Sequence, residues 1–152
     1  MDEKVFKRFS VFTVLVANIN RCIRRIKTEE MAEFNLKSPH VSCLYYLYHS
    51  SALTAKELVD LCGEDKAAIS RSIDHLESEG YITCQSSAKK RYKSPLVLTD
   101  AGREVARNIA DKVDGVIMLA SEGMDDGERE VLYRCLSLIN ENLQTVCDRY
   151  DK

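Results

Sequence analysis

The feature that most limits the possible folds is a pair of short amphipathic segments separated only by Gly63-Glu64. The first follows Thr54-Ala55-Lys56-Glu57, in which the threonine hydroxyl and the glutamate carboxylate each accept a backbone N–H at a helix start. The second begins after Asp65, a favoured cap residue, and closes at Gly80. Two short helices across a tight turn predict a helix-turn-helix. The expected buried side chains are Leu58, Leu61 and Cys62 on the first helix and Ile69, Ile73 and Leu76 on the second.

A β-hairpin is predicted directly after these helices. Residues 81–85 alternate apolar and polar side chains, and Leu96-Val97-Leu98-Thr99 is expected to pair with them across the polar stretch 86–94. The tip, Lys89-Lys90-Arg91-Tyr92-Lys93, has four cations and no acid. It is the most one-sided charge cluster in the chain and therefore the expected local basic patch.

Amphipathic helices are predicted before this segment. Apolar residues at three-and-four spacing extend over six turns between Val5 and Ile26, and the cations between Arg21 and Lys27 are expected to form a solvated face. Ser38-Pro39 supplies a cap and a first-turn proline for a helix that ends near Ser50-Ser51.

Two more helices are predicted after the hairpin. Thr99-Asp100 caps one whose apolar stripe extends from Val105 to Ala120, with Gly115 as a weak point inside it. Asp125-Asp126-Gly127-Glu128 is a second capping box, before a stripe from Leu132 to Tyr150. The long helices have more apolar stripe than one small core can cover, so we expect a homodimer.

The expected fold class is mainly α with a small β-hairpin wing, a winged helix-turn-helix with long N- and C-terminal dimerisation helices. We expect one domain over residues 1–152, with the winged helix-turn-helix core at about 38–99 and dimerisation helices at about 4–30 and 100–150.

Composition and charge limit the partners. The formal net charge of −2 means that any contact with nucleic acid must come from a local patch. The six cysteines are far apart, without CxxC pairs, which fits a reducing compartment. The N-terminus has no export signal and no stretch is apolar enough to span a membrane, so a cytoplasmic protein is expected.

A helix-turn-helix followed by a hairpin can place its second helix in the major groove and its hairpin tip against the backbone or minor groove. Free N–H groups at Ser38 and Thr54-Ala55 are expected to anchor phosphates. A symmetric dimer would then bind a palindromic operator in double-stranded DNA. The expected DNA-binding residues are Thr54, Lys66, Ala67, Ser70, Arg71, Asp74, Lys89, Lys90, Arg91 and Lys93.

Over nearly its full length the chain resembles the MarR family of bacterial regulators. The resemblance lies in Ser38-Pro39, in Thr54-Ala55-Lys56-Glu57-Leu58, in the segment from Ile69 to Ile82, and in Leu98-Thr99-Asp100-Ala101-Gly102. It implies a winged-helix dimer joined through its terminal helices, usually a repressor relieved by a small ligand or by oxidation. It also implies that Ser70 and Arg71 face DNA and that Arg91 enters the minor groove.

The wing tip departs from the family pattern. The family usually has an acidic residue shortly before the wing arginine, whereas this chain reads Ser86-Ser87-Ala88-Lys89-Lys90-Arg91. The salt bridge that would orient Arg91 is missing. Lys89, Lys90 and Lys93 would then provide long-range attraction in place of a fixed contact.

Catalysis, metal binding and thiol chemistry are the alternative functions that the residues could support. No catalytic motif is present, so neither an enzyme nor a cofactor is expected. His40 and Cys43 are one helical turn apart, but a pair falls short of the four ligands of a structural zinc site. Cys22, Cys62, Cys84, Cys135 and Cys147 lie on or beside apolar stripes, where packing is the simpler interpretation and a thiol switch the alternative.

An inducer pocket and a pure protein-interaction module also stay open. Tyr45, Tyr46, Tyr48 and His49 could line a pocket for a small molecule, where the family usually has one, although aromatic residues at this spacing are more often core. Short amphipathic helices with a hairpin also occur in protein-interaction modules, which is the alternative function.

Overall fold

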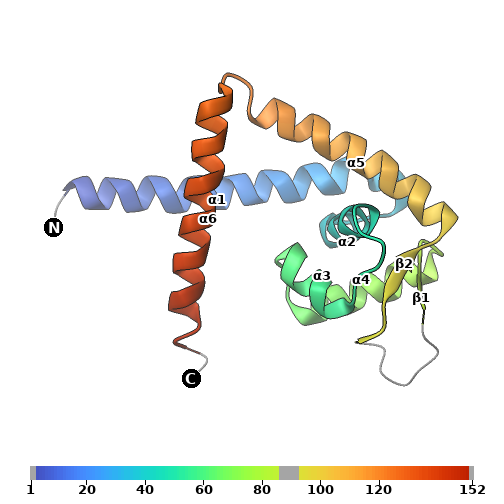
Figure 1. Cartoon of the computed structure of the whole chain (residues 1–152). Coiled ribbons are helices and arrows are strands. Elements are labelled where there is room, and N and C mark those ends of the chain that lie inside the picture. Colours follow the sequence, from blue (N-terminus) through green and yellow to red (C-terminus); the bar gives the residue numbers. More distant parts are fainter. Residues whose placement is uncertain (1–2, 86–92, 151–152) are drawn as a thin grey trace. The chain divides into compact units, whose positions relative to one another are not determined.

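The computed structural model describes residues 3–85 and 93–150. The chain divides into two compact units, Met1–Val113 and Asp114–Lys152. The elements in chain order (Figure 1) are α1 (Glu3–Glu30), the 3-10 helix η1 (Ala32–Phe34), α2 (Ser38–Tyr48), α3 (Ala55–Cys62), α4 (Lys66–Ser78), β1 (Ile82–Cys84), β2 (Leu96–Leu98), α5 (Asp100–Ala120) and α6 (Asp126–Cys147). The prediction of a mainly helical chain with one small hairpin is confirmed.

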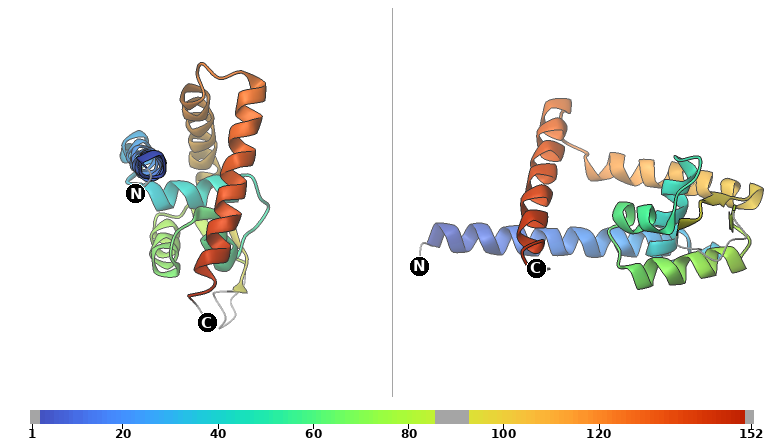
Figure 2. Two further views of the ribbon diagram at one scale, coloured as in Figure 1. Left: turned by 90° about the vertical axis from the view of Figure 1, so that its left-hand side faces the viewer. Right: turned by 60° about the horizontal axis from the view of Figure 1, so that its bottom comes forward.

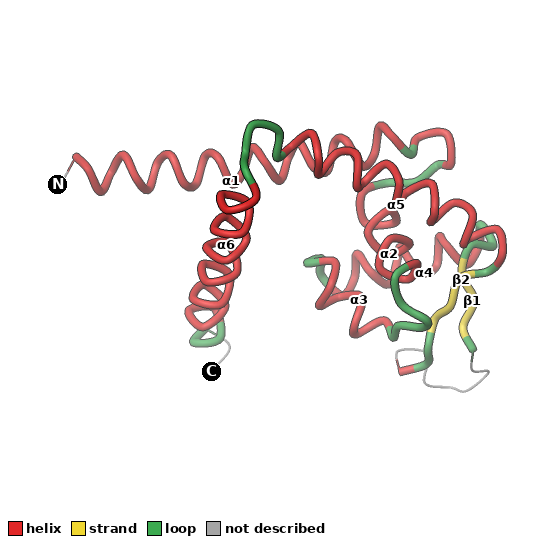
Figure 3. The backbone as a smooth tube through the Cα atoms, turned by 45° about the horizontal axis from the view of Figure 1, so that its top comes forward, coloured by secondary structure: helices red, strands yellow, loops and turns green. Residues whose placement is uncertain are grey.

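The caps of α3 and α4 are those that the sequence predicts. The Thr54 hydroxyl accepts the Glu57 N–H at 3.3 Å, and the Glu57 carboxylate accepts the Thr54 N–H at 2.7 Å. Gly63 ends α3 with a φ of 63°, a left-handed conformation that favours glycine. Asp65 accepts the Ala68 N–H at 2.7 Å and starts α4. The connection between the two helices is short (Figure 3), with Gly63 ending α3 and the Asp65 cap starting α4.

The start of α2 differs from the prediction by one residue. Lys37, not Ser38, is the cap, and its N–H donates to Nδ1 of His40 at 3.1 Å. Ser38 is the first helical residue and is buried, and its N–H donates to the Thr28 hydroxyl at 3.3 Å. The cap prediction is wrong because an imidazole from the next turn takes the place of the serine hydroxyl.

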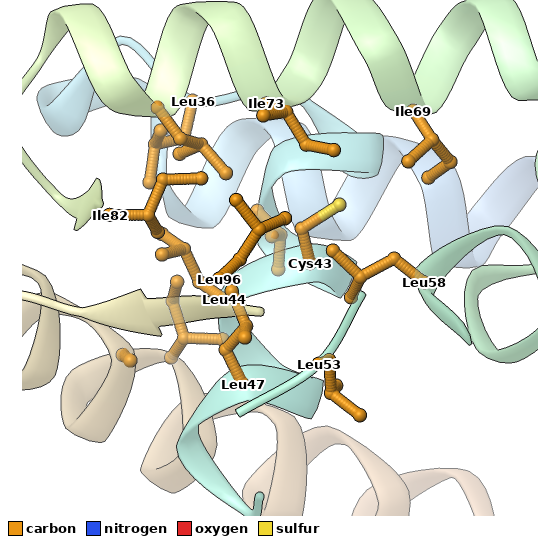
Figure 4. Close-up of a cluster of buried hydrophobic side chains, with 14 of the residues drawn as sticks. Leu36, Cys43, Leu44, Leu47, Leu53, Leu58, Ile69, Ile73, Ile82 and Leu96 are labelled. Carbon is orange, nitrogen blue, oxygen red and sulfur yellow. The ribbon is translucent and has the colours of Figure 1, made fainter. Parts of the chain in front are cut away.

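The core of the first unit forms where α2, α3, α4 and the hairpin meet. Ile69, Ile73 and Leu58 are buried as predicted (Figure 4). Leu76 is buried as predicted too. Leu61 was expected to be buried and this is wrong, because its side chain is 44% exposed. It lies about 100° around the helix from Cys62, away from the face that packs on the core.

The hairpin is tied to the helices at both of its ends. β1 and β2 are antiparallel, with Ile82 opposite Leu98. Leu53, in the loop before α3, exchanges two backbone hydrogen bonds with Leu96, at 3.1 and 2.8 Å. The hairpin base is thus fixed against the segment that leads into the helix-turn-helix.

Thr99 and Gly102 join the end of the hairpin to the end of α4. The Thr99 hydroxyl donates to the Gly80 carbonyl at 2.6 Å and accepts the Gly102 N–H at 3.0 Å, while the Thr99 N–H donates to the Tyr81 carbonyl at 3.0 Å. A Cβ on Gly102 would lie 1.8 Å from the Tyr81 carbonyl oxygen. This close approach requires glycine at position 102, and the hydrogen bonds of the hydroxyl require threonine at position 99.

The basic side of α1 is only partly solvated. Arg24 forms an ion pair with Glu64 at 2.6 Å, and Lys27 donates to the Ser42 hydroxyl at 2.9 Å. Further along, Lys112 of α5 contacts the Glu30 carboxylate at 3.2 Å. The expectation of a solvated face is therefore wrong for Lys27, which is partly buried, whereas Arg24 stays exposed. Both side chains link the C-terminal half of α1 to the winged-helix core.

The apolar stripes of α1 and α6 are exposed within the single chain. α1 presents Val5, Phe12, Leu15, Val16, Ile19 and Ile23, and α6, whose box of Asp125 and Glu128 forms as predicted, has no buried residue. Figure 2 shows both helices as long, regular rods. In the part of the chain that the structure describes, no helix combines the length and apolarity needed to cross a bilayer.

Candidate nucleic-acid interface

α4 has two chemically distinct sides. The side toward the core has Ile69, Ile73 and Leu76, all of which are buried. The other side, which we call the α4 outer face, consists of exposed Lys66, Ala67, Ser70, Arg71 and Asp74. Cation, hydroxyl and carboxylate groups on one exposed helical face are the groups that contact phosphates and base edges.

The packing of α4 fixes the direction of this face. Ser72, buried on the inner side, donates to the Ala68 carbonyl at 2.8 Å, so its hydroxyl is satisfied within the helix. The Asp65 cap holds the first turn. Because the buried side cannot rotate outward without exposing Ile69 and Ile73, the outer face is presented in one orientation.

A hollow adjoins the α4 outer face between α3, α4 and β2. Its apolar floor includes Val59, Ile69 and Leu96, and Lys66 and Ser70 are among its polar lining. The polar groups that face solvent are therefore supported by apolar side chains from all three elements. Such support restricts side-chain motion and favours a preorganised contact surface.

Two helix starts were expected to offer free N–H groups to phosphates. The Thr54 N–H is accepted by Glu57, which also accepts the Thr54 hydroxyl at 2.8 Å. The Ser38 N–H donates to Thr28, so the expectation of a free donor at Ser38 is wrong. The expectation of a free N–H at Thr54 is wrong for the same reason, because the Glu57 carboxylate takes it. Thr54 lies partly exposed at the start of α3, and another role for it on DNA stays a prediction.

The wing is described only in part. Lys93, at the return of the hairpin, is exposed. Lys89, Lys90 and Arg91 lie outside the described residues, so their expected roles stay predictions. The strands leading to them are anchored through Leu53 and Thr99, which places the hairpin next to α4 in Figure 1.

The aromatic residues expected to line a pocket form one cluster on α2. The Tyr45 and His49 rings are 4.7 Å apart between centroids, and those of Tyr48 and His49 are 5.3 Å apart. Tyr46 meets Tyr45 edge to face at 5.7 Å. Beside the cluster, Tyr48 lines a surface hollow with the α5 residues Asp100, Arg103, Glu104 and Arg107. Charged groups at a partly exposed aromatic surface suit a polar ligand. Binding of a small molecule at this surface stays a prediction.

His40 and Cys43 point to different partners. The His40 ring stacks on His75 of α4 at 4.3 Å, and the Cys43 sulfur contacts the Cys62 sulfur at 3.9 Å. Burial, with added repulsion from His75 and Lys37, lowers the pKa of His40 to about 4. No group of three metal-ligating side chains occurs among the residues that the structure describes. Sequence spacing missed both pairs because each joins two different helices.

A helix-turn-helix whose second helix has an exposed polar face, followed by a hairpin anchored beside it, defines a winged helix-turn-helix protein. The model of the MarR family matches residues 34–91, from η1 to the wing. The chain is 24% identical over 136 residues to the uncharacterized HTH-type transcriptional regulator YwaE of Bacillus subtilis, covering 90% of this chain and 80% of that one. Residues 34–91 of this chain are thus similar to the MarR family, and the relative that matches most of the chain is described as an HTH-type transcriptional regulator.

Solved structures show the same fold. A MarR family regulator from Listeria monocytogenes, complexed with a 26mer DNA, superposes with a TM-score of 0.75 at 25% identity, covering 84% of this chain and 85% of that one. The MarR family regulator NMB1585 from Neisseria meningitidis gives a TM-score of 0.74 at 17% identity, covering 94% and 96%. The fold class predicted from the sequence is thereby confirmed.

Proposed function

We propose that this chain is a homodimeric repressor that binds a palindromic operator in double-stranded DNA in the cytoplasm and is released by a small ligand or by thiol oxidation. The observation that supports this most is the α4 outer face. It is polar and exposed, and the core beneath it holds it in one orientation beside an anchored wing. The Listeria regulator named above, which has this fold, was solved with DNA.

Within this proposal the α4 outer face enters the major groove. Arg71 and Ser70 would contact base edges, while Lys66, Thr54 and Lys93 would contact phosphates, with Ala67 and Asp74 at the edge of the contact. Lys89, Lys90 and Arg91 would reach the backbone or minor groove. Because the whole chain is weakly acidic, this local concentration of cations would provide the salt-dependent part of binding.

The exposed apolar stripes support a homodimer. Leu15 and Ile19 of α1 are 53% and 58% exposed, and Leu138 and Leu143 of α6 are 57% and 52% exposed. Contiguous apolar surface of this kind is rarely left uncovered in a monomer. We assign residues of about 4–30 and 100–150 to the dimer interface and about 38–99 to DNA binding. Two-fold symmetry would then place two α4 helices in successive major grooves, about 34 Å apart.

Fluorescence anisotropy with labelled DNA flanking the protein's own gene tests the proposal, at two salt concentrations and with Arg71→Ala and Arg107→Ala variants. Arg107 is exposed on α5, so its variant removes the same charge outside the α4 outer face. Because residue 107 falls within the range assigned to the dimer interface, the variant serves as the control once size-exclusion chromatography without added ligand shows the same oligomeric state as the wild type. We expect Arg71→Ala to weaken specific binding by about 1–3 kcal/mol, roughly 5- to 150-fold, and Arg107→Ala to change it little. Equal effects of the two variants would reject the assignment of α4. Lack of salt-sensitive, site-specific binding on this and other genomic DNA would favour a protein-interaction module.

A further inference from the structure

Two cysteines from different helices of the winged-helix core meet at their sulfur atoms. Cys43 lies on α2 and Cys62 is the last residue of α3, and their Sγ atoms are 3.9 Å apart. Cys43 is fully buried, in the centre of the cluster that Figure 4 shows, whereas Cys62 is partly exposed. One member of the pair is thus a partly exposed residue, and the other lies fully buried beside it.

The surroundings favour a thiolate on the accessible member. The hydrogen bond with Cys43, together with the positive charge of Lys27, lowers the pKa of Cys62 against the opposing effects of burial and of the Glu64 carboxylate. The same hydrogen bond and burial raise the pKa of Cys43. Lys27 is held in place by the Ser42 hydroxyl at 2.9 Å. A partly exposed thiol of lowered pKa beside a second thiol is the arrangement of oxidation-sensitive cysteine pairs.

We propose that Cys43 and Cys62 form an oxidation site at which a hydroperoxide converts the two thiols into a disulfide between α2 and α3, which weakens DNA binding. Only the last clause rests on the proposed function, because the thiol chemistry can be measured without DNA. The proposal also selects one pair among the six cysteines. Cys22, Cys135 and Cys147 are exposed on α1 and α6 and lie outside the winged-helix core.

The chemistry is a two-electron oxidation in two steps. The Cys62 thiolate attacks the terminal oxygen of the hydroperoxide, the O–O bond breaks, and the alkoxide leaves as an alcohol after taking up a proton. Cys62 is then a sulfenic acid. The Cys43 sulfur attacks the Cys62 sulfur, the S–OH bond breaks, and the hydroxide leaves as water with the Cys43 proton. Two thiols and one organic hydroperoxide give one disulfide, one alcohol and one water, and with hydrogen peroxide a second water takes the place of the alcohol.

Closure of the bond would strain the start of α4. The sulfurs must approach from 3.9 Å to about 2.0 Å, and the proposal is that this closure draws the end of α3 toward α2 as well as rotating the two side chains. Cys62 is followed directly by Gly63, by Glu64, which is paired with Arg24, and by Asp65, the cap of α4. These residues connect the disulfide to the first turn of the α4 outer face without an intervening flexible segment.

The test uses the full chain with Cys22, Cys84, Cys135 and Cys147 replaced by serine, so that only the pair remains. Treatment with hydrogen peroxide or cumene hydroperoxide is followed by thiol titration and intact mass measurement under denaturing, non-reducing conditions. We expect both thiols to disappear with the loss of two hydrogens from one chain, and dithiothreitol to restore them. Persistence of both thiols, or oxygen uptake at Cys62 with Cys43 still reactive, would overturn the proposal.

Single variants in the same background separate the two roles. Cys43→Ala removes a small buried side chain, so circular dichroism first establishes that the variant is folded. We expect Cys62 in it to stop at a sulfenic acid that dimedone traps, whereas Cys62→Ser should leave Cys43 unreacted. Rapid oxidation of Cys43 in Cys62→Ser would show that the accessible thiol is wrongly assigned.

A DNA-binding measurement distinguishes failure of the proposed function from failure of the disulfide proposal. The reduced pair protein must bind the operator, and its failure to do so refutes the proposed function while the mass measurement still decides the thiol chemistry. We expect the disulfide form to bind roughly tenfold more weakly and the Cys62→Ser variant to be insensitive to peroxide. A disulfide that forms but leaves the affinity unchanged overturns the regulatory step.

Discussion

The contact between Gly102 and Tyr81 makes a sharp prediction about stability. Gly102 lies in the first turn of α5, and a Cβ there would be 1.8, 2.7 and 3.0 Å from the O, C and Cα atoms of Tyr81. All three are backbone atoms, and the Tyr81 backbone is held by hydrogen bonds to Leu76 at 2.9 Å and from Thr99 at 3.0 Å. Gly102→Ala must therefore move α5 away from the end of α4.

The size of the effect follows from three contributions. Overpacking costs about 1–3 kcal/mol, and weakening the hydrogen bonds around Thr99 costs about 1 kcal/mol. The higher helix propensity of alanine returns at most about 1 kcal/mol. We expect Gly102→Ala to lower the free energy of unfolding by about 1–4 kcal/mol.

Urea unfolding followed by circular dichroism measures this at a fixed protomer concentration, because dimerisation also contributes to stability. Gly115→Ala is the matched control, since it is the same substitution in the same helix and has nothing within 4 Å of the added Cβ. It should leave stability unchanged or raise it by up to about 1 kcal/mol. If Gly102→Ala unfolds at the same urea concentration as the control, the close packing of α5 on Tyr81 is refuted.

Two further predictions concern the core and pH. Leu58→Ala should lower the free energy of unfolding by about 2–5 kcal/mol, whereas Leu61→Ala on the exposed side of the same helix should change it by less than about 0.5 kcal/mol; equal losses would contradict the observed burial. Since burial lowers the pKa of His40 to about 4 from 6.5, the unfolded chain binds the proton first, so stability should fall as the pH drops from about 6.5 toward 4. Allowing for solvent screening of the half-buried ring, this loss in the free energy of unfolding is about 1–2 kcal/mol. The urea midpoints of unfolding at pH 5 and pH 7 should therefore differ less in His40→Asn than in the wild type. An unchanged difference would exclude His40 as the cause.

Much of the fold follows from local signals in the sequence. The capping pairs of Thr54 with Glu57 and Asp125 with Glu128 lie three residues apart, so the hydrogen bonds that start α3 and α6 are decided within one turn. The two-sided character of α4 follows from the spacing of Ile69, Ile73 and Leu76 in the same way. These features depend only on neighbours along the chain, and they place the α4 outer face correctly.

The contacts that could not be predicted from the sequence join different helices and depend on how those helices pack. The Arg24–Glu64 ion pair joins residues 40 apart in sequence, and the Cys43–Cys62 contact joins residues 19 apart. Spacing alone pairs His40 with Cys43, whereas the packing of α2 against α3 and α4 sends them to different partners. A cysteine on an apolar stripe looks like a small hydrophobic residue until the second thiol beside it is seen.

Selection of binding sites from a pool of random duplex DNA tests the central claim most directly. For the reduced wild-type dimer we predict an inverted repeat whose half-sites are about 10 base pairs apart between centres, because two symmetric α4 helices would occupy successive major grooves. Arg71→Ala should select a less defined half-site and retain the spacing. Recovery of no consensus, or of a single site without two-fold symmetry, would contradict the account of a dimer that recognises DNA through α4.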